Sequence, residues 1–301
     1  MASMNTLVTI EAKPEPTTID LARTAVVVVD MQNDFGAEGG MFHRAGVDIS
    51  SIRQAIVPTA RVLAAARKSG VKIVYLKTEY RPDLSDLGPV DSPNWIALKR
   101  SRVGERVTTP DGTEGQIMIR ETWNTQIVCE LVPEPGDIVV SKHRFSGFYG
   151  TDLELILRGL GIEYLVFTGC TTSVCVESTM RDAMFRDFRC VLLADCTAEP
   201  IGEGLSRSNH DASLFILQRV FGWVSDSAHL IEALGAQPVV SQSFLMEQRV
   251  ANKKTCRPER SWVGGKIMLS HWMARDQFST RMVPAALRRG GVLCHKRGQM
   301  W

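Results

Sequence analysis

The chain has 301 residues, of which 44% are hydrophobic and 23% are charged, and its formal net charge is only +2. These values are typical of a globular protein with a substantial core, and they give no indication of a nucleic-acid or membrane partner. The charge is unevenly distributed along the chain. Residues 241–301 hold 12 of the 35 basic residues and 3 of the 33 acidic residues, so residues 1–240 hold 23 basic and 30 acidic residues. A mildly acidic body carries a basic tail.

The lack of a recognisable targeting signal and the spacing of the cysteines both predict a reducing cytoplasm. The first residues lack an apolar core of secretory-signal length, and no apolar run approaches the roughly 20 residues that span a bilayer. The seven cysteines are irregularly spaced and form no CxxC pair, so they predict neither a disulfide framework nor a zinc site.

Strands and helices alternate along the chain after an N-terminal arm rich in Pro, Thr and Glu, residues 1–20. Short apolar runs predict strands, and runs with helical spacing predict helices. The expected strands cover residues 24–30, 71–77, 137–142, 163–169 and 190–195. The expected helices cover residues 52–69, 151–160, about 174–187, 205–219 and 227–234.

This alternation predicts an α/β domain over residues 21–238, with a doubly wound, Rossmann-like, mostly parallel sheet and helices on both faces. Residues 80–135 are polar and show little periodicity, which is typical of a functional lid or insertion. Residues 239–301 show no amphipathic pattern, so we expect a basic, poorly ordered C-terminal extension.

Three reactive side chains follow predicted strands. Asp30 ends the first, Lys142 ends the third, and Cys175 lies just after the fourth, where a helix begins. The carboxyl ends of parallel strands share one edge, so we expect these groups to meet there. The thiolate is the nucleophilic form of a cysteine, and a nearby ammonium and a helix N-terminus favour it by lowering the pKa of the thiol. A carboxylate can accept the thiol proton and return it to a leaving amine. The residues alone leave a cysteine hydrolase and a non-catalytic protein both open.

At these positions the sequence resembles the isochorismatase-like cysteine hydrolases, from about residue 20 to 236. The resemblance is carried by VVVVDMQNDF (26–35), PGDIVVSKHRFSGFYGTDL (135–153) and VFTGCTTSVCVESTMRDA (166–183). Within the family, SPNW (92–95), KHRFSGF (142–148) and FGWVSD (221–226) are most similar to the ureidoacrylate amidohydrolase branch, and EYRPDLSDL (79–87) is similar to the biuret amidohydrolase branch.

The resemblance implies the family's fold and its catalytic triad, here Asp30, Lys142 and Cys175. It also implies a cis peptide bond between Cys170 and Thr171, and an oxyanion hole formed by the backbone N–H groups of Thr171 and Cys175. The nicotinamidase branch binds a metal through Asp and His residues after the second strand. The corresponding stretch here, KTEYRPD (77–83), has no His, so we expect no metal and no other cofactor.

The activity implied is hydrolysis of a carbamoyl C–N bond in a small ureide or amide through a thioester, with ureidoacrylate of pyrimidine degradation as the first candidate. Biuret or an N-carbamoyl amino acid is the alternative, and a non-catalytic scaffold with this fold is a second alternative. By similarity, the substrate pocket would include Phe35, Tyr80, Asn94 and Phe145, and Arg81 or Arg144 would bind an anionic substrate. We expect a homo-oligomer without nucleic-acid or membrane partners.

Overall fold

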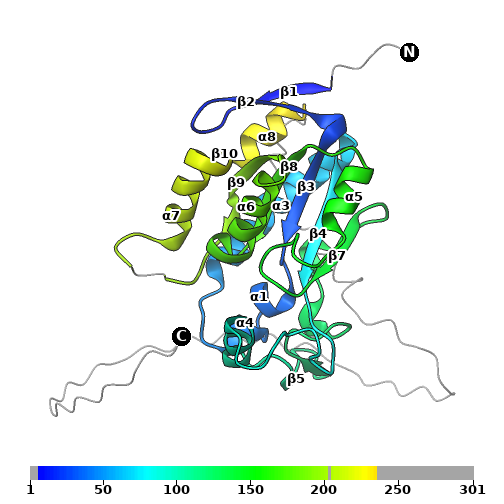
Figure 1. The fold of residues 1–301 in the computed structure, drawn as a ribbon, viewed down its shortest axis with the longest axis vertical. Coiled ribbons are helices and arrows are strands. Elements are labelled where there is room, and N and C mark those ends of the chain that lie inside the picture. The colour runs from blue at the N-terminus through cyan, green and yellow to red at the C-terminus, as the bar shows by residue number, and fades with distance from the viewer. Residues whose placement is uncertain (1–5, 203–204, 236–301) are drawn as a thin grey trace, which may run out of the picture. The chain divides into compact units, whose positions relative to one another are not determined.

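The computed structural model describes residues 6–202 and 205–235 (Figure 1). Residues 1–5, 203–204 and 236–301 are not described, so the predicted basic extension, residues 239–301, lies outside the described residues.

The centre of the fold is a six-stranded sheet with the order β10-β9-β8-β3-β4-β7, in which every neighbouring pair is parallel. Its strands are β3 (Thr24–Val29), β4 (Lys72–Thr78), β7 (Ile138–Lys142), β8 (Tyr164–Cys170), β9 (Arg189–Ala198) and β10 (Trp223–Ser225). The predicted α/β class with a parallel sheet is confirmed. The strand β10 was not predicted from the sequence, because it has only three residues.

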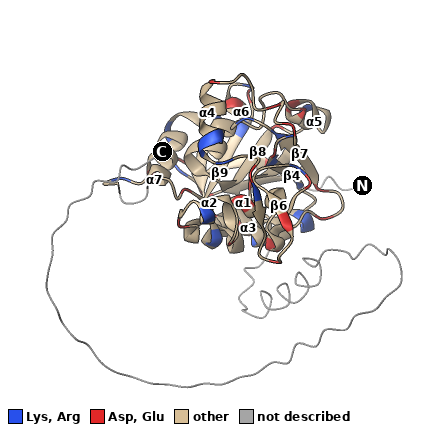
Figure 2. Cartoon of the chain, turned by 90° about the horizontal axis from the view of Figure 1, so that it is seen from below, with Lys and Arg blue, Asp and Glu red and all other residues tan. Residues whose placement is uncertain are grey.

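Helices cover both faces of this sheet, as the end-on view in Figure 2 shows. Successive side chains of a strand point to opposite faces, so Val26 and Val28 pack in the cluster that contains Ile52 and Ile56 of α3 (Ser50–Lys68). Val27 packs in the cluster on the other face, with α5 (Leu153–Gly159) and α6 (Glu177–Met184). Of the remaining long helices, α7 (Asn209–Ile216) lies against this second cluster and α8 (Ser227–Ala233) against the first.

Residues 80–135 are more ordered than their sequence pattern predicts. They form α4 (Pro93–Arg100), the antiparallel pair β5 (Arg106–Thr108) and β6 (Glu114–Gln116), and 3-10 turns at Trp123–Thr125 and Cys129–Leu131. Ile117, Met118 and Ile119 are almost completely buried and belong to the core cluster on the α3 face. This insertion is therefore part of the domain and not a free loop.

Several short elements complete the described chain. Within the predicted N-terminal arm, β1 (Leu7–Ile10) and β2 (Thr17–Asp20) pair antiparallel. A 3-10 turn (Leu21–Arg23), α1 (Asn33–Gly36) and α2 (Met41–Arg44) flank β3, and π-helical turns occupy Thr172–Val176 and Leu217–Phe221. In the part of the chain that the structure describes, no helix is long and apolar enough to cross a membrane.

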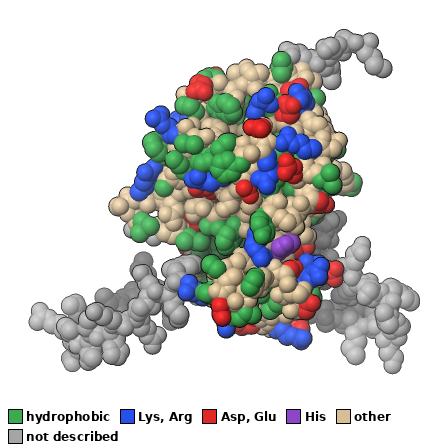
Figure 3. Space-filling model, viewed as in Figure 1, with side chains coloured by type: hydrophobic (Ala, Val, Ile, Leu, Met, Phe, Trp, Pro, Cys, Tyr) green, Lys and Arg blue, Asp and Glu red, His purple; other side chains and the backbone are tan. Residues whose placement is uncertain are grey.

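The face formed by α5, α6 and α7 carries exposed hydrophobic side chains among arginines (Figure 3). Phe185 packs edge-on against Phe221, with their ring centroids 6.1 Å apart. Four large hydrophobic side chains on these helices and their ends are more than half exposed, namely Leu155, Phe185, Phe215 and Val220. We call these four residues the apolar face.

Candidate active site

The carboxyl ends of three adjacent strands meet at one point of the sheet. Asp30 directly follows β3, Lys142 is the last residue of β7, and Thr78 is the last residue of β4, which lies between the two. Thr78 is directly opposite Lys142 in the β4–β7 ladder. The sequence reasoning predicted that Asp30 and Lys142 would meet here; the strand that separates them supplies a third polar side chain.

Asp30 and Lys142 form an ion pair, with Lys142 Nζ 2.8 Å from Asp30 Oδ2, and both side chains are 0% exposed. The ammonium also donates to Thr78 Oγ1 at 2.5 Å and to the Arg144 carbonyl oxygen at 3.2 Å. Two buried charges are tolerated only with such partners, because their transfer out of water costs several kcal/mol per ion. The backbone of Asp30 is in the left-handed region, with φ of 50°, where the chain turns out of β3.

Cys175 reaches the same point from the next strand on the other side of β3. It lies in the π-helical turn Thr172–Val176 that follows β8 and leads into α6. Its side chain is 7% exposed, and its thiol interacts with both the Asp30 carboxylate and the Lys142 ammonium. The structure thus brings the three predicted residues together.

Burial dominates the ionisation of this cluster. It raises the pKa of the Cys175 thiol above its ordinary value; Lys142 lowers this pKa in part, and the Asp30 carboxylate raises it further. Although burial alone lowers the pKa of Lys142, the negative charges of Asp30 and Cys175 outweigh it and raise that pKa. The lowered thiol pKa expected from the sequence is therefore wrong for this structure, because burial outweighs the attraction of the ammonium.

The turn that carries the cysteine is anchored from several directions. The peptide bond between Cys170 and Thr171 is cis, which confirms that prediction. The N–H groups of Val174 and Val176 both donate to the Thr171 carbonyl oxygen at 3.2 Å. Glu199, which is 8% exposed, accepts a 2.9 Å hydrogen bond from the Ser173 N–H and another from its hydroxyl.

The four predicted substrate-pocket residues occupy different environments. Phe35 is buried and packs edge-on against Phe42 at 5.2 Å, whereas Phe145 is 42% exposed. Tyr80 is buried near the thiol, and its pKa is raised by burial and further by the charge of Cys175. Asn94 donates to the Leu87 carbonyl oxygen at 2.8 Å, while its Oδ1 is buried without a hydrogen-bond partner among the described residues.

The sequence reasoning missed Thr78 and Gln32. The side chain of Gln32 holds the backbone of Thr78 on both sides: Oε1 accepts from the Thr78 N–H at 2.8 Å, and Nε2 donates to the Thr78 carbonyl oxygen at 3.0 Å. The expected strand ended at residue 77, one position too early. Extending it to Thr78 would have selected this residue by the strand-end reasoning that selected Lys142.

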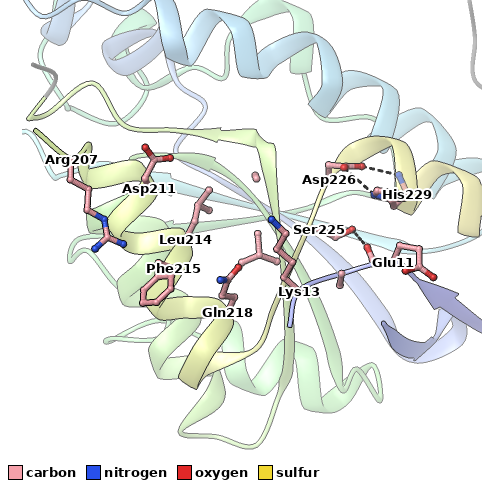
Figure 4. A pocket seen from close by; sticks show the side chains of 13 residues that line it. Glu11, Lys13, Arg207, Asp211, Leu214, Phe215, Gln218, Ser225, Asp226 and His229 are labelled. Atoms are coloured by element: carbon pink, nitrogen blue, oxygen red, sulfur yellow. Dashed lines mark hydrogen bonds and ion pairs between the residues drawn. The ribbon is translucent and has the colours of Figure 1, made fainter. Parts of the chain in front are cut away.

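A cavity of about 600 Å³ lies away from this cluster, between α7, β10 and the segment around Lys13 (Figure 4). Its walls carry both signs of charge, from Lys13 and Arg207 and from Glu11, Asp211 and Asp226. None of Asp30, Lys142 and Cys175 lines it. Within residues 6–202 and 205–235, no group of three or more His, Cys, Asp or Glu side chains is arranged to hold a metal ion.

A family model, curated relatives and solved structures that are similar to this chain agree with one another. The family model described as isochorismatase domain matches residues 24–229. Ureidoacrylate amidohydrolase RutB of Methylobacterium radiotolerans is 41% identical over 231 residues, which are 76% of this chain and 86% of that protein. The crystal structure of a cysteine hydrolase from Pseudomonas syringae pv. phaseolicola is similar with a TM-score of 0.61 and 28% identity, over 78% of this chain and 99% of that chain. That of N-carbamoylsarcosine amidase from Thermoplasma acidophilum has a TM-score of 0.50 and 26% identity, over 68% and 96% of the two chains.

Proposed function

The chain belongs to the isochorismatase domain family, and from this premise we propose that it is a cysteine-dependent amidohydrolase that cleaves the carbamoyl C–N bond of a small ureide. Ureidoacrylate is the substrate we favour, which would place the enzyme in pyrimidine degradation. The observation that carries the proposal is the buried cluster of the Cys175 thiol with the Asp30–Lys142 ion pair. Relatives named for ureidoacrylate and for N-carbamoylsarcosine support a carbamoyl substrate.

The proposed acylation step begins with proton transfer. Asp30 accepts the thiol proton as the Cys175 sulfur attacks the carbamoyl carbon of R–NH–CO–NH₂. The tetrahedral oxyanion accepts hydrogen bonds from the backbone N–H groups of Thr171 and Cys175, and donors of this kind typically contribute about 3–4 kcal/mol each. Asp30 then returns the proton to the substrate nitrogen, the C–N bond breaks, and R–NH₂ leaves a carbamoyl thioester on Cys175.

Hydrolysis of the thioester completes the cycle. Asp30 accepts a proton from a water molecule, which attacks the thioester carbon, and carbamate leaves as the sulfur is protonated again. Lys142 keeps its charge throughout, since its pKa is raised, and it stabilises whichever of Asp30 and Cys175 is negative. The carboxylate rather than the ammonium is the proton carrier.

Among the arginines near the site, we propose that Arg144 binds the substrate carboxylate. Its carbonyl oxygen accepts from Lys142 Nζ at 3.2 Å, so its backbone touches the catalytic cluster. The charge of Arg144 lowers the pKa of the Tyr80 hydroxyl and that of Cys175 raises it, so both residues lie near this hydroxyl. Arg81 is exposed, which favours Arg144.

We also propose that the chain forms a homo-oligomer that buries the apolar face defined above (Figure 3). Phe185→Asp at this face should reduce the mass of the particle measured by sedimentation velocity, because a charge would be buried in the contact. Unchanged mass would contradict this choice of surface. A reducing cytoplasm suits the proposal, since Cys175 must remain a thiol to act as the nucleophile.

The decisive variant is Cys175→Ala, with Cys129→Ala as a control outside the cluster. Carbamate and ammonia release should be followed with ureidoacrylate, biuret and N-carbamoyl amino acids. We expect Cys175→Ala to lose turnover with every substrate and Cys129→Ala to retain it. Retained turnover in Cys175→Ala would refute the covalent route, and no release from any substrate by the unmodified protein would favour the scaffold alternative.

A further inference from the structure

We infer that Thr78 is a positioning residue that reserves Oδ2 of Asp30 for proton transfer; this inference rests on the proposed function. Asp30 and Lys142 come from strands that are not neighbours, and Thr78 ends the strand between them. Its hydroxyl contacts both, at 2.9 Å from Asp30 Oδ1 and at 2.5 Å from Lys142 Nζ.

The chemistry of the three groups fixes the direction of these hydrogen bonds. A lysine ammonium can only donate, so Thr78 Oγ1 accepts from Lys142 and its single proton is left for Asp30 Oδ1. The chain of donors therefore runs from Lys142 through Thr78 to Asp30, and the hydroxyl cannot turn away without leaving an ammonium N–H unpaired in a buried site.

The two oxygens of the Asp30 carboxylate are consequently different. Oδ1 accepts from the Thr78 hydroxyl at 2.9 Å and from the Thr78 N–H at 3.0 Å. That N–H is shared with Gln32 Oε1 at 2.8 Å, which leaves the hydroxyl as the undivided donor to Oδ1. Oδ2 has the Lys142 charge at 2.8 Å but accepts no aligned hydrogen bond within the described part of the chain.

The oxygen that neither donor of Thr78 occupies is the one left to accept the thiol proton. Two donors on Oδ1 hold the plane of the carboxylate, so that Oδ2 stays beside Lys142, while the carboxylate interacts with the Cys175 thiol. Thr78 thus sets which oxygen acts and how readily the carboxylate takes up a proton, without itself touching the substrate. Gln32 supports this role by holding the Thr78 backbone.

The test compares Thr78→Val, which removes the hydroxyl and keeps the shape, with Thr78→Ser, which keeps the hydroxyl. We expect kcat/KM for the hydrolysed ureide to fall by about 10- to 100-fold in Thr78→Val, as for loss of a hydrogen bond to a charged group, and to stay within about 3-fold in Thr78→Ser. The acid limb of the kcat/KM profile should move to higher pH in the valine variant alone, because a carboxylate with one donor fewer is protonated more readily.

A second measurement needs no substrate. The rate at which iodoacetamide alkylates Cys175, followed by peptide mass analysis against pH, should shift in the same direction in Thr78→Val and stay unmoved in Thr78→Ser. If the valine variant does not fold, Thr78→Ala replaces it with the same expectations. Equal losses in the serine and valine variants, or an unmoved pH profile in the valine variant, would overturn the inference. A wild-type protein that is alkylated at Cys175 yet hydrolyses no ureide would instead overturn the proposed function.

Discussion

Replacing Lys142 with methionine isolates the contribution of the buried ammonium. The side chain keeps a similar length but loses its charge, so the Asp30 carboxylate remains 0% exposed without its cation. Removing one partner of a buried ion pair typically costs about 3–5 kcal/mol. Thr78 Oγ1 and the Arg144 carbonyl oxygen lose their donor as well, so we expect the upper part of that range. The total stability of a domain is only about 5–15 kcal/mol, so the effect is large.

Urea unfolding at several pH values would measure this loss. We expect the free energy of unfolding to fall by about 4 kcal/mol at pH 8 and by less at pH 5, where the uncompensated carboxylate takes up a proton more easily. The double variant Asp30→Asn with Lys142→Met removes both charges and should recover about 2 kcal/mol relative to Lys142→Met alone. Carbamate release should be absent from both, which would separate the stability of the pair from its chemistry.

Two results would refute this reasoning. The first is a loss below about 1 kcal/mol in Lys142→Met, which is the range of exposed ion pairs and would mean that water reaches the site. The second is a double variant that is less stable than Lys142→Met, which would mean that the carboxylate is held by its hydrogen bonds and not by the ammonium.

Three further predictions concern substrate charge, pH and the anchored turn. Arg144→Gln should lower kcat/KM about 10- to 100-fold for a ureide that carries a carboxylate but change it little for neutral biuret. Steady-state kinetics would measure this, with Arg100→Gln as an exposed control. Equal effects on both substrates would contradict the assignment. Burial raises the pKa of Asp34 to about 6 from its ordinary 3.8, so its contribution to the unfolding free energy should decrease by about 2 kcal/mol as pH rises from 4 to 6. Asp34→Asn should remove this part of the pH dependence in urea titrations. Glu199→Gln should lower kcat about 10-fold with little change in KM, because the side chain keeps only one oxygen to accept the hydrogen bonds of the Ser173 and Ile201 N–H groups. An unchanged kcat would show that the cysteine turn keeps its conformation without the second acceptor.

The fold was predictable where the sequence signal is local. The apolar run at residues 24–30 predicts a strand buried on both faces, and β3 is that strand. The order in residues 80–135 depends on contacts between distant positions instead. The buried Asp34 carboxylate, for example, accepts from Met41 N–H, Met118 N–H and Asn124 Nδ2, which lie up to 90 residues away along the chain. No periodicity within the insertion could indicate these contacts.

The candidate site shows the same division. Strand-end positions were sufficient to predict that Asp30 and Lys142 lie at the same edge of the sheet, because parallel strands end at one edge. The raised pKa of the Cys175 thiol was not predictable, since it results from burial that only the folded chain creates. Thr78 was missed because the expected strand ended at residue 77, one position before the end of β4.

The central claim is that Cys175 carries the carbamoyl group during turnover. Rapid quenching in acid during the first turnover with ureidoacrylate, followed by mass analysis of the intact protein and its peptides, tests this directly. We predict an added mass of one carbamoyl group on the peptide that contains Cys175, which appears and decays at rates consistent with kcat. Full release of carbamate in the first turnover with no adduct on that peptide, or an adduct on another side chain, would contradict the account.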